Sequence, residues 1–469
     1  MKGCHPANDQ KKRDEPGMRK ASLHFCLLKV GVAFELAAGS VEFEEIRARA
    51  AALAADPFQP STNGLPEGLR QLRFVQYQNI QFNHERALWR EEGLPFQIEF
   101  FHRGWVHNQT VTIHEIISNE TRPVPFSTEF FGYGTNHFDL GENLGFAGLR
   151  IVCPVKHFGE LASFLGASYF RMIGLGQVYG TSARGLALNT GSTQSEEFPV
   201  FKEFWLRKPE KSNKEMIVFA LMDSVSVAGA FQFVIRPGPS TVTTVKTSLF
   251  VRKPVARVGI APLTSMFLYG ENGHPLFSDF RPEVHDADGV LLQTGQGEWI
   301  WHPLEAGKMM RVNVFQDENP KGFGLMQRDR NFDHYQDLVA RFQLRPSVWI
   351  KPLGQWGKGS VELVQLPTNV EFSDNTVAFW VPATQPKIGQ PIDLQYEIHW
   401  TTNEIASASL GRVRSTRVGR VTEEPPLDPP HLRFVIDFEG QAIEKLSAKY
   451  NLKPRSNADL ERSLSLTVF

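Results

Sequence analysis

The segment 280–301 has the sequence FRPEVHDADGVLLQTGQGEWIW and combines acidic residues, a histidine, turn-forming glycines and two tryptophans. Tryptophan rings stack on the apolar faces of pyranose rings, and one carboxyl group facing another can break a glycosidic bond. Asp286, Asp288 and Gly289 also suit a plain hairpin turn between two strands. The two interpretations are compatible, because catalytic groups often lie on turns that a rigid sheet holds in place.

The overall composition gives no sign of a nucleic-acid partner. Among the 469 residues, 50 Lys and Arg nearly balance 51 Asp and Glu, so the chain has no strong net field. Three cysteines, Cys4, Cys26 and Cys153, lack the spacing of a metal or redox site and exclude a disulfide framework. The length is sufficient for one large domain and one small domain.

Short apolar alternations broken by Gly, Pro and Asn dominate the chain from residue 65 onward, as in LRFVQYQNIQF and TTVKTSLFVRK. This pattern predicts an all-β, antiparallel fold, and no regular alternation of helix and strand supports a doubly wound sheet. Residues 43–55 have helical spacing and good helix formers, which predict a helix. We expect a second helix at 160–170, in ELASFLGASYF.

Both ends of the chain differ in pattern from its centre. Residues 1–42 have the order of a secretory signal, with a basic start, an apolar core and small residues, but charged side chains interrupt the core. We interpret them as a leader or damaged signal peptide; a tail on a cytosolic protein is the alternative. Proline and glycine mark a linker near 384, and strands at 394–400 and 431–438 predict a small immunoglobulin-like domain over 385–469, incomplete at its C-terminal end.

Other motifs give no support to a cofactor or a metal. The glycines of 173–180 resemble a phosphate-binding loop, but they follow a predicted helix and lack a Walker-type lysine. His102, His107 and His114 have irregular strand spacing and no carboxylate companion, so we expect no metal there. Apart from the leader, no apolar run is long enough to span a bilayer, and no stable membrane insertion is expected.

Several long strings resemble the periplasmic glucan biosynthesis protein G/D family. They are FRPEVHDADG, GEWIW, NPKGFGLMQRDRNFDHYQDL, RPSVWIKPLGQWGKGSVELVQLPT, SDNTVAFW and YFRMIGLGQVYGTSARGLALNT, and the resemblance covers about residues 43–440. It implies a large galactose-mutarotase-like β-sandwich over 43–384, joined to the small immunoglobulin-like domain and exported to the periplasm. The family acts on osmoregulated glucans, which are polymers of β-1,2-linked glucose, and a membrane glucan synthase is a candidate partner.

The resemblance also implies a catalytic pair of aspartates, as in inverting endo-β-1,2-glucanases and related transglycosylases. It places the general acid at Asp374 and the general base at Asp286, with Glu371 and Asp288 as the respective alternatives. Candidate glucan contacts are Tyr179, Arg184, Asp288, Glu298, Trp299, Tyr335, Trp356 and Trp380. Core packing is the competing interpretation for each tryptophan. Two function classes remain open: an enzyme acting on β-1,2-glucan, and a non-catalytic glucan-binding or assembly factor.

Overall fold

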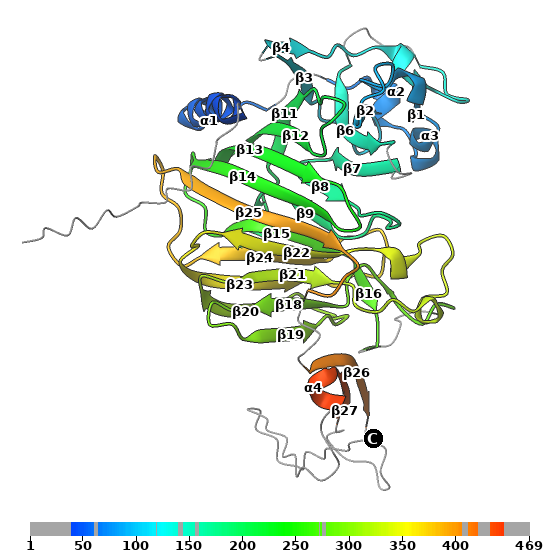
Figure 1. The fold of residues 1–469 in the computed structure, drawn as a ribbon, viewed down its shortest axis with the longest axis vertical. Helices are drawn as coiled ribbons and strands as arrows, with labels where there is room; N and C mark the ends of the chain where they lie inside the picture. Colours follow the sequence, from blue (N-terminus) through cyan, green and yellow to red (C-terminus); the bar gives the residue numbers. More distant parts are fainter. Residues whose placement is uncertain are drawn as a thin grey trace, which may run out of the picture. The chain divides into compact units, whose positions relative to one another are not determined.

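The computed structural model describes residues 39–60, 64–118, 120–138, 144–154, 159–271, 273, 278–405, 411–420 and 432–444. The leader predicted over 1–42 therefore lies, up to residue 38, outside the described residues. None of the described helices is long and apolar enough to cross a membrane. The regular structure of the described chain is mainly β-strand, with 46% of residues in strands and 10% in helices, which confirms the predicted all-β class (Figure 1).

The first large sheet has ten strands, and all its neighbouring pairs are antiparallel. In spatial order they are β2 (Gln97–His102), β6 (Phe146–Cys153), β7 (Gly159–Leu165), β8 (Tyr169–Met172), β9 (Ser182–Arg184), β15 (Val258–Ser265), β24 (Thr376–Pro382), β23 (Lys358–Gln365) and β20 (Arg311–Glu318), with β10 (Ala187–Leu188) pairing with β15.

The second large sheet has eleven strands, and β11 and β3 form its parallel pair. In spatial order they are β19 (Trp299–Pro303), β18 (Gly289–Gln293), β21 (Gly322–Met326), β22 (Ser347–Leu353), β25 (Ile392–Thr401), β14 (Thr241–Val251), β13 (Val227–Arg236), β12 (Met216–Asp223), β11 (Val200–Arg207), β3 (Thr112–Ile117) and β4 (Glu120–Pro123).

Three two-stranded sheets and several short helices complete the described elements. The small sheets are β1 (Gln81–Phe82) with β5 (Phe131–Gly132), β16 (Phe267–Tyr269) with β17 (Val284–His285), and β26 (Arg412–Arg420) with β27 (Leu432–Glu439). The helices are α1 (Gly39–Ala55), α2 (Glu67–Arg70), α3 (Phe74–Gln78), η1 (His84–Arg86), η2 (Thr128–Phe130), η4 (Phe332–His334), η5 (Phe342–Leu344) and α4 (Gln441–Glu444).

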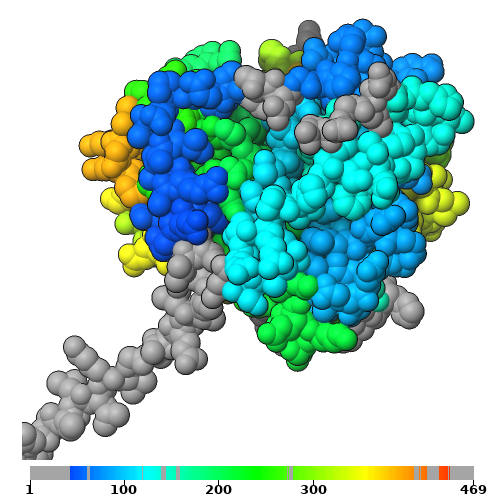
Figure 2. Space-filling model, turned by 90° about the horizontal axis from the view of Figure 1, so that it is seen from above, coloured from blue at the N-terminus to red at the C-terminus, as the bar shows by residue number. Residues whose placement is uncertain are grey.

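The two large sheets bury one apolar core between them. Phe164 and Phe170 of the first sheet contact Phe233 of the second, with ring centroids 5.3 and 5.1 Å apart. Burial of such rings is the main source of stability in a β-sandwich. Helix α1, predicted at 43–55, is confirmed, and it packs Phe43 against the other face of the second sheet. Figure 2 shows this helix, in dark blue, on the surface beside the green strands.

The helix predicted at 160–170 is wrong. This stretch forms β7 and β8, joined by a tight turn in which Gly166 and Ala167 have φ of 80° and 43°. The residues favour a helix locally, but β7 pairs with β6 and its Leu161 and Phe164 enter the core. Pairing and burial outweigh helix propensity here.

The strand predicted at 394–400 as part of a second domain is also misplaced. It is β25, which pairs with β14 and β22 in the middle of the eleven-stranded sheet. The Pro and Gly before it mark a loop within the sandwich and no domain boundary. The strand predicted at 431–438 is β27, which forms a hairpin with β26. The immunoglobulin-like domain stays a prediction, because residues 406–410, 421–431 and 445–469 lie outside the described part of the chain.

Candidate functional site

Asp374 precedes β24, at one end of the ten-stranded sheet. Its Oδ2 lies 3.9 Å from Nη2 of Arg171 on β8, and 26% of its side-chain surface is exposed. Burial raises the pKa of the Asp374 carboxyl; Arg171 opposes this shift and the negative charge of Asp286 adds to it. The two aspartates of the predicted pair therefore lie within electrostatic reach of each other, although 88 positions separate 286 from 374 in the sequence.

Asp286 follows β17 and is 5% exposed. Its carboxylate forms an ion pair with the guanidinium of Arg345, which lies between η5 and β22. The turn that carries Asp286 is not the predicted hairpin turn, because β17 pairs with β16 whereas β18 pairs with β19 and β21. It joins two different sheets, and this position brings Asp286 near the end of the ten-stranded sheet.

Residues 266 and 267, at the start of β16, bind Asp286 and the neighbour of Asp374. The side-chain amide of Asn375, next to Asp374, accepts a hydrogen bond from the peptide N–H of Phe267 at 2.8 Å and donates to the peptide oxygen of the same residue at 2.9 Å. The peptide N–H of Asp286 donates to the oxygen of Met266 at 2.8 Å. Both candidate catalytic residues are thus anchored to adjacent peptide groups of the chain at 266–267.

The face of the ten-stranded sheet that points away from the core carries polar side chains. Because strand residues alternate, Ala183 enters the core and Arg184 points the other way, where its Nη1 donates to Glu196 at 2.8 Å. The Arg184 guanidinium lies 4.7 Å from the ring centre of Tyr169, and its charge also acts on Asp374. One predicted contact, Arg184, is thus near the candidate acid.

Tyr179 lies beside Glu160 on this polar face. Burial raises the pKa of the Tyr179 hydroxyl well above its usual range, and the charge of Glu160 adds to the shift. Arg171 lies near both Tyr179 and Asp374, because its positive charge acts on each of them. Its Nε donates to Oγ of Ser182 on the neighbouring strand at 2.6 Å. This face therefore offers fixed donors and an aromatic edge, as recognition of sugar hydroxyls requires.

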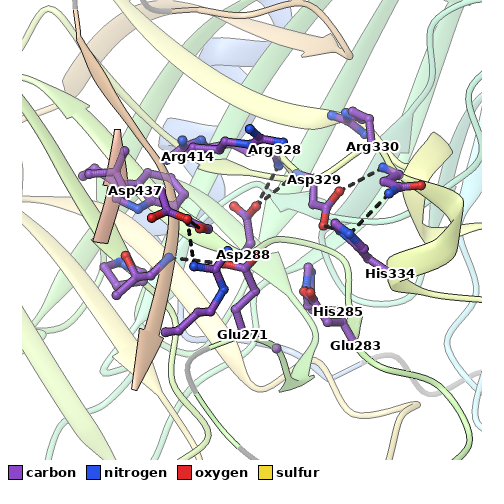
Figure 3. A pocket seen from close by; sticks show the side chains of 18 of the residues that line it. Glu271, Glu283, His285, Asp288, Arg328, Asp329, Arg330, His334, Arg414 and Asp437 are labelled. Carbon is purple, nitrogen blue, oxygen red and sulfur yellow. Dashed lines mark hydrogen bonds and ion pairs between the residues drawn. The ribbon is translucent and has the colours of Figure 1, made fainter. Parts of the chain in front are cut away.

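Asp288, the alternative base, faces a pocket that Figure 3 shows from close by. Its Oδ2 accepts hydrogen bonds from the peptide N–H groups of Arg328 and Asp329 at 3.0 and 3.2 Å. Burial raises the pKa of the Asp288 carboxyl. In the same pocket Glu283, Asp329 and His334 bring possible ligand atoms for a cation within 4.8 Å of one another. Asp288 thus holds the segment that follows β21.

Glu371, the alternative acid, is tied to an arginine. Nη2 of Arg281 lies 2.8 Å from its Oε2, and the same guanidinium contacts Asp279 at 2.8 Å and Asp337 at 3.0 Å. Arg281 therefore links three loops around the site. These contacts favour a structural role for Glu371 over proton donation.

Three predicted glucan contacts are buried, which contradicts a direct contact with a sugar. Trp380 is 0% exposed and Trp356 is 9% exposed, and their rings pack together in the main core with centroids 6.2 Å apart. Tyr335 is 0% exposed and packs edge-to-face on His285. The pattern of aromatic residues in the sequence could not separate core from surface, because the sandwich needs large rings to fill its interior.

Glu298 and Trp299 lie in and after the turn between β18 and β19. Glu298 is exposed, and Trp299 is half-buried, with its ring tilted against Trp349 at a centroid distance of 5.8 Å. Trp299 and Trp301 line a second pocket. Trp299 therefore keeps the exposed surface that stacking on a sugar needs, but it belongs to a different part of the surface from Asp374.

Arg171, Arg345 and Asn375 complete the candidate site, and the sequence reasoning missed all three. Arg171 carried a usable signal, because it is a charged residue inside the strand YFRM, whose neighbours enter the core. Arg345 and Asn375 gave no such signal. Their roles depend on contacts with residues 59 and 108 positions away, at Asp286 and Phe267.

Comparisons of the sequence with known proteins agree on the family to which it is similar. Residues 41–468 match the family described as "Periplasmic glucan biosynthesis protein, MdoG". The "Glucans biosynthesis protein G" of Ralstonia nicotianae is 47% identical, with 88% of this chain and 84% of the relative covered. Those of Sodalis glossinidius and Pseudomonas paraeruginosa are 43% and 42% identical and cover 88% and 86% of this chain, and 81% and 79% of the relatives. The chain belongs to the MdoG family of periplasmic glucan biosynthesis proteins.

Proposed function

We propose that this protein acts in the periplasm on the β-1,2-linked backbone of glucans, as an inverting endo-glucanase or a transglycosylase. The observation that supports this most is the pair formed by Asp374 and Asp286. One is a carboxyl group whose pKa is raised by burial, and the charge of the other adds to that shift. Two carboxyl groups in unlike surroundings are what acid and base catalysis of glycoside cleavage needs.

In the proposed reaction Asp374 is protonated and donates its proton to the glycosidic oxygen as the bond to the anomeric carbon breaks. A water molecule attacks that carbon from the opposite face and gives its proton to Asp286. In transfer, a sugar hydroxyl takes the place of the water. In this proposal Arg171, whose side chain is 43% exposed, binds hydroxyl groups of the glucan beside Asp374, whereas Arg184 is 5% exposed and acts on Asp374 through its charge. A membrane glucan synthase as partner remains part of this proposal.

A non-catalytic glucan-binding or assembly factor is the second candidate. The ion pair between Asp286 and Arg345 favours it, because Asp286 is 5% exposed and its carboxylate is already bound by the arginine. A base that activates water must be reachable by water. Under the enzymatic proposal, glucan binding has to move Arg345 away from Asp286, or to leave one carboxylate oxygen of Asp286 open to water.

The decisive experiment incubates the purified protein, Asp374→Asn and a control, Asp56→Asn, with linear β-1,2-glucan. Product size and anomeric configuration are followed, and glucan retention is measured separately. Asp56 is exposed and lies after α1, so its substitution removes one surface charge only. We expect shorter or cyclised products from the parent and the control. General acid catalysis is worth about 10²–10⁴-fold, so Asp374→Asn should lose that much rate while it retains glucan.

Other outcomes separate the two candidates. Equal product from Asp374→Asn and the parent would refute Asp374 as the acid. No product from any of the proteins, with glucan retained by all, would favour the binding factor. Neither product nor retention would refute both.

A further inference from the structure

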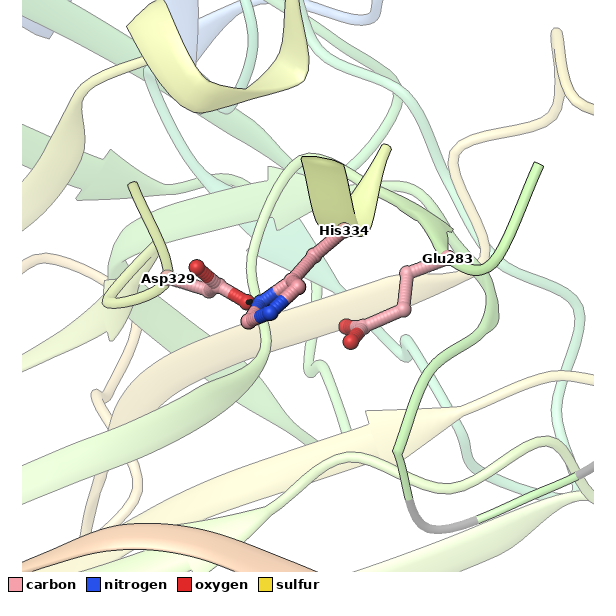
Figure 4. A group of neighbouring side chains, drawn as sticks. All are labelled: Glu283, Asp329 and His334. Atoms are coloured by element: carbon pink, nitrogen blue, oxygen red, sulfur yellow. Dashed lines mark hydrogen bonds and ion pairs between the residues drawn. The ribbon is translucent and has the colours of Figure 1, made fainter. Parts of the chain in front are cut away.

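Three side chains from two segments far apart in the sequence meet at the pocket that Asp288 lines. Glu283 precedes β17, Asp329 follows β21 and His334 ends η4, and their ligand atoms lie within 4.8 Å of one another (Figure 4). From this geometry we propose that Glu283, Asp329 and His334 bind one divalent transition-metal ion. The site is separate from the Asp374 cluster, and the proposal does not depend on the activity proposed above.

Glu283 is held in position by a chain of buried contacts. It is 7% exposed, and its Oε2 lies 2.8 Å from Nε2 of His285, which is fully buried. Nδ1 of His285 lies 2.8 Å from Oε1 of Gln327, and its ring stacks on Phe267. Metal-binding side chains are commonly oriented by such outer hydrogen bonds, which reduce the cost of ordering them when the ion binds.

Asp329 and His334 provide the other two ligands and the route of entry. Nδ1 of His334 is hydrogen-bonded to Oδ2 of Asp329, and 47% of the His334 side chain is exposed. An ion can therefore reach the ligands from solvent. On binding, it takes the place of the proton that these two side chains share, and that proton leaves to water.

A second observation at the same pocket also indicates a cation. Oδ1 of Asp288 is fully buried and finds no hydrogen-bond partner among the described residues. A buried carboxylate oxygen without a partner carries a desolvation cost, and a positive charge or its bound water would relieve it. The carboxyl group of Glu271 also lines this pocket (Figure 3).

The donor set selects the class of metal. One imidazole nitrogen with two carboxylates suits Zn²⁺ or Mn²⁺, whereas Ca²⁺ and Mg²⁺ prefer oxygen ligands throughout. A bound ion would tie the segment after β21 to the segment before β17. Asp286 lies three positions after Glu283, so the ion would also stiffen the support of the candidate base.

The test uses the full chain, stripped with a chelator and dialysed, with Zn²⁺ as the probe. Zinc content after gel filtration and calorimetric titration are compared for the parent, His334→Ala and Glu283→Gln. His399→Ala is the matched control, because His399 also contacts a carboxylate, Glu397 at 3.1 Å, on β25. We expect one zinc per chain and a raised melting temperature for the parent and the control.

Loss of an outer hydrogen bond alone costs about 10–100-fold in metal affinity, so His334→Ala should lose at least about 100-fold. His334 is half-exposed, so this variant keeps its fold and decides the matter even if the buried Glu283→Gln does not fold. Zinc bound equally by the parent and His334→Ala would refute the site, as would no zinc bound by the parent. Binding of Ca²⁺ but not Zn²⁺ or Mn²⁺ would refute the class of metal.

Discussion

A Cβ atom on Gly180 would lie 2.9 Å from Cβ of Arg345 and 3.0 Å from its Cδ. The backbone approaches the arginine this closely because position 180 has no side chain. The peptide N–H of Val178 donates to the oxygen of Leu344 at 3.2 Å and reinforces the contact. Gly180 thus sets the position of the arginine that pairs with Asp286, and it lies on the segment that leads to Arg184.

Replacing Gly180 by alanine should move Arg345 and disturb its ion pair with Asp286. Overpacking of this kind costs about 1–3 kcal/mol of unfolding free energy. A misplacement of about 1 Å can cost up to about 10²-fold in rate, so turnover of β-1,2-glucan should fall by more than the stability loss explains. Gly68→Ala is the control, because an added Cβ there meets no atom within 4 Å. Full turnover by Gly180→Ala would show that Arg345 has no influence on the reaction.

Asn375→Ala should misplace Asp374 without removing it. The change leaves the two peptide groups of Phe267 without their side-chain partner and costs about 1–3 kcal/mol. We expect kcat on glucan to fall while KM changes little, because the binding groups on β8 and β9 stay in place. Asn369→Ala, in the exposed part of the same loop, should leave both constants unchanged. An equal loss of binding and rate would indicate general unfolding of the site.

Asp374→Asn should make the protein more stable at neutral pH. The pKa of Asp374 is raised in the folded state by burial, so the folded protein pays for the ionised carboxylate at pH values above that pKa. This cost is absent below the unfolded pKa of about 3.9, where the group is protonated in both states. Urea denaturation should show a gain of about 1 kcal/mol near pH 7 that shrinks as the pH falls through the raised pKa. A constant difference at all pH values would contradict this origin.

The sequence predicted the sandwich well but only part of the site. Short apolar runs identify strands such as β12 and β13, because most of their side chains are buried. The same rule fails for β7, because its small and apolar residues also suit a helix. Its pairing with β6, which makes it a strand, cannot be read from the local sequence. It also fails for Trp356, between β22 and β23, and for Trp380 in β24, since a large ring fits a core and a sugar platform equally well.

The two aspartates could be proposed only through the resemblance to a family. Nothing in SDN or HDADG by itself separates a catalytic carboxylate from a turn residue. The raised pKa of Asp374 comes from burial and from the charge of Asp286, and Arg171, Arg184 and Arg345 oppose it; all four residues lie far from Asp374 in the sequence. Charged residues that folding brings together from distant segments leave no periodic pattern in the sequence. Their proximity therefore cannot be predicted from the sequence alone.

Arg281→Ala should release the loops around the site. Its guanidinium contacts Asp279, Asp337 and Glu371, and removing one partner of a largely buried ion pair costs about 3–5 kcal/mol. Hydrogen exchange should therefore speed up in residues 366–375 and 332–341, with little change in the core strand β13. Unchanged exchange in both loops would show that the ion pairs are not what holds them.

The stabilisation by Arg281 should also depend on pH. Its hydrogen bond lowers the pKa of Asp279 below the usual range, so this stabilisation is present above the unfolded pKa of about 3.9. It is lost as the pH falls through the lower folded pKa. The stability difference between the parent and Arg281→Ala should therefore be largest near neutral pH and should narrow in strong acid.

Replacement by alanine should mainly reduce stability at Trp380 and mainly reduce glucan binding at Trp299. Trp380 is fully buried between the sheets, so Trp380→Ala should cost about 3–5 kcal/mol in unfolding free energy. Trp299 is half-buried beside a pocket, so Trp299→Ala should cost much less stability. If glucan stacks on this ring, about 0.5–1.5 kcal/mol of binding is lost and Kd rises up to about tenfold.

Denaturation curves and glucan retention on the same two variants separate the two roles. Retention unchanged in Trp299→Ala would remove this residue from the glucan contacts and confine recognition to the polar face of the ten-stranded sheet. Weaker retention in Trp380→Ala without any loss of stability would contradict its place in the core. Because the two rings pack on different partners, Trp349 and Trp356, their effects should add in the double variant.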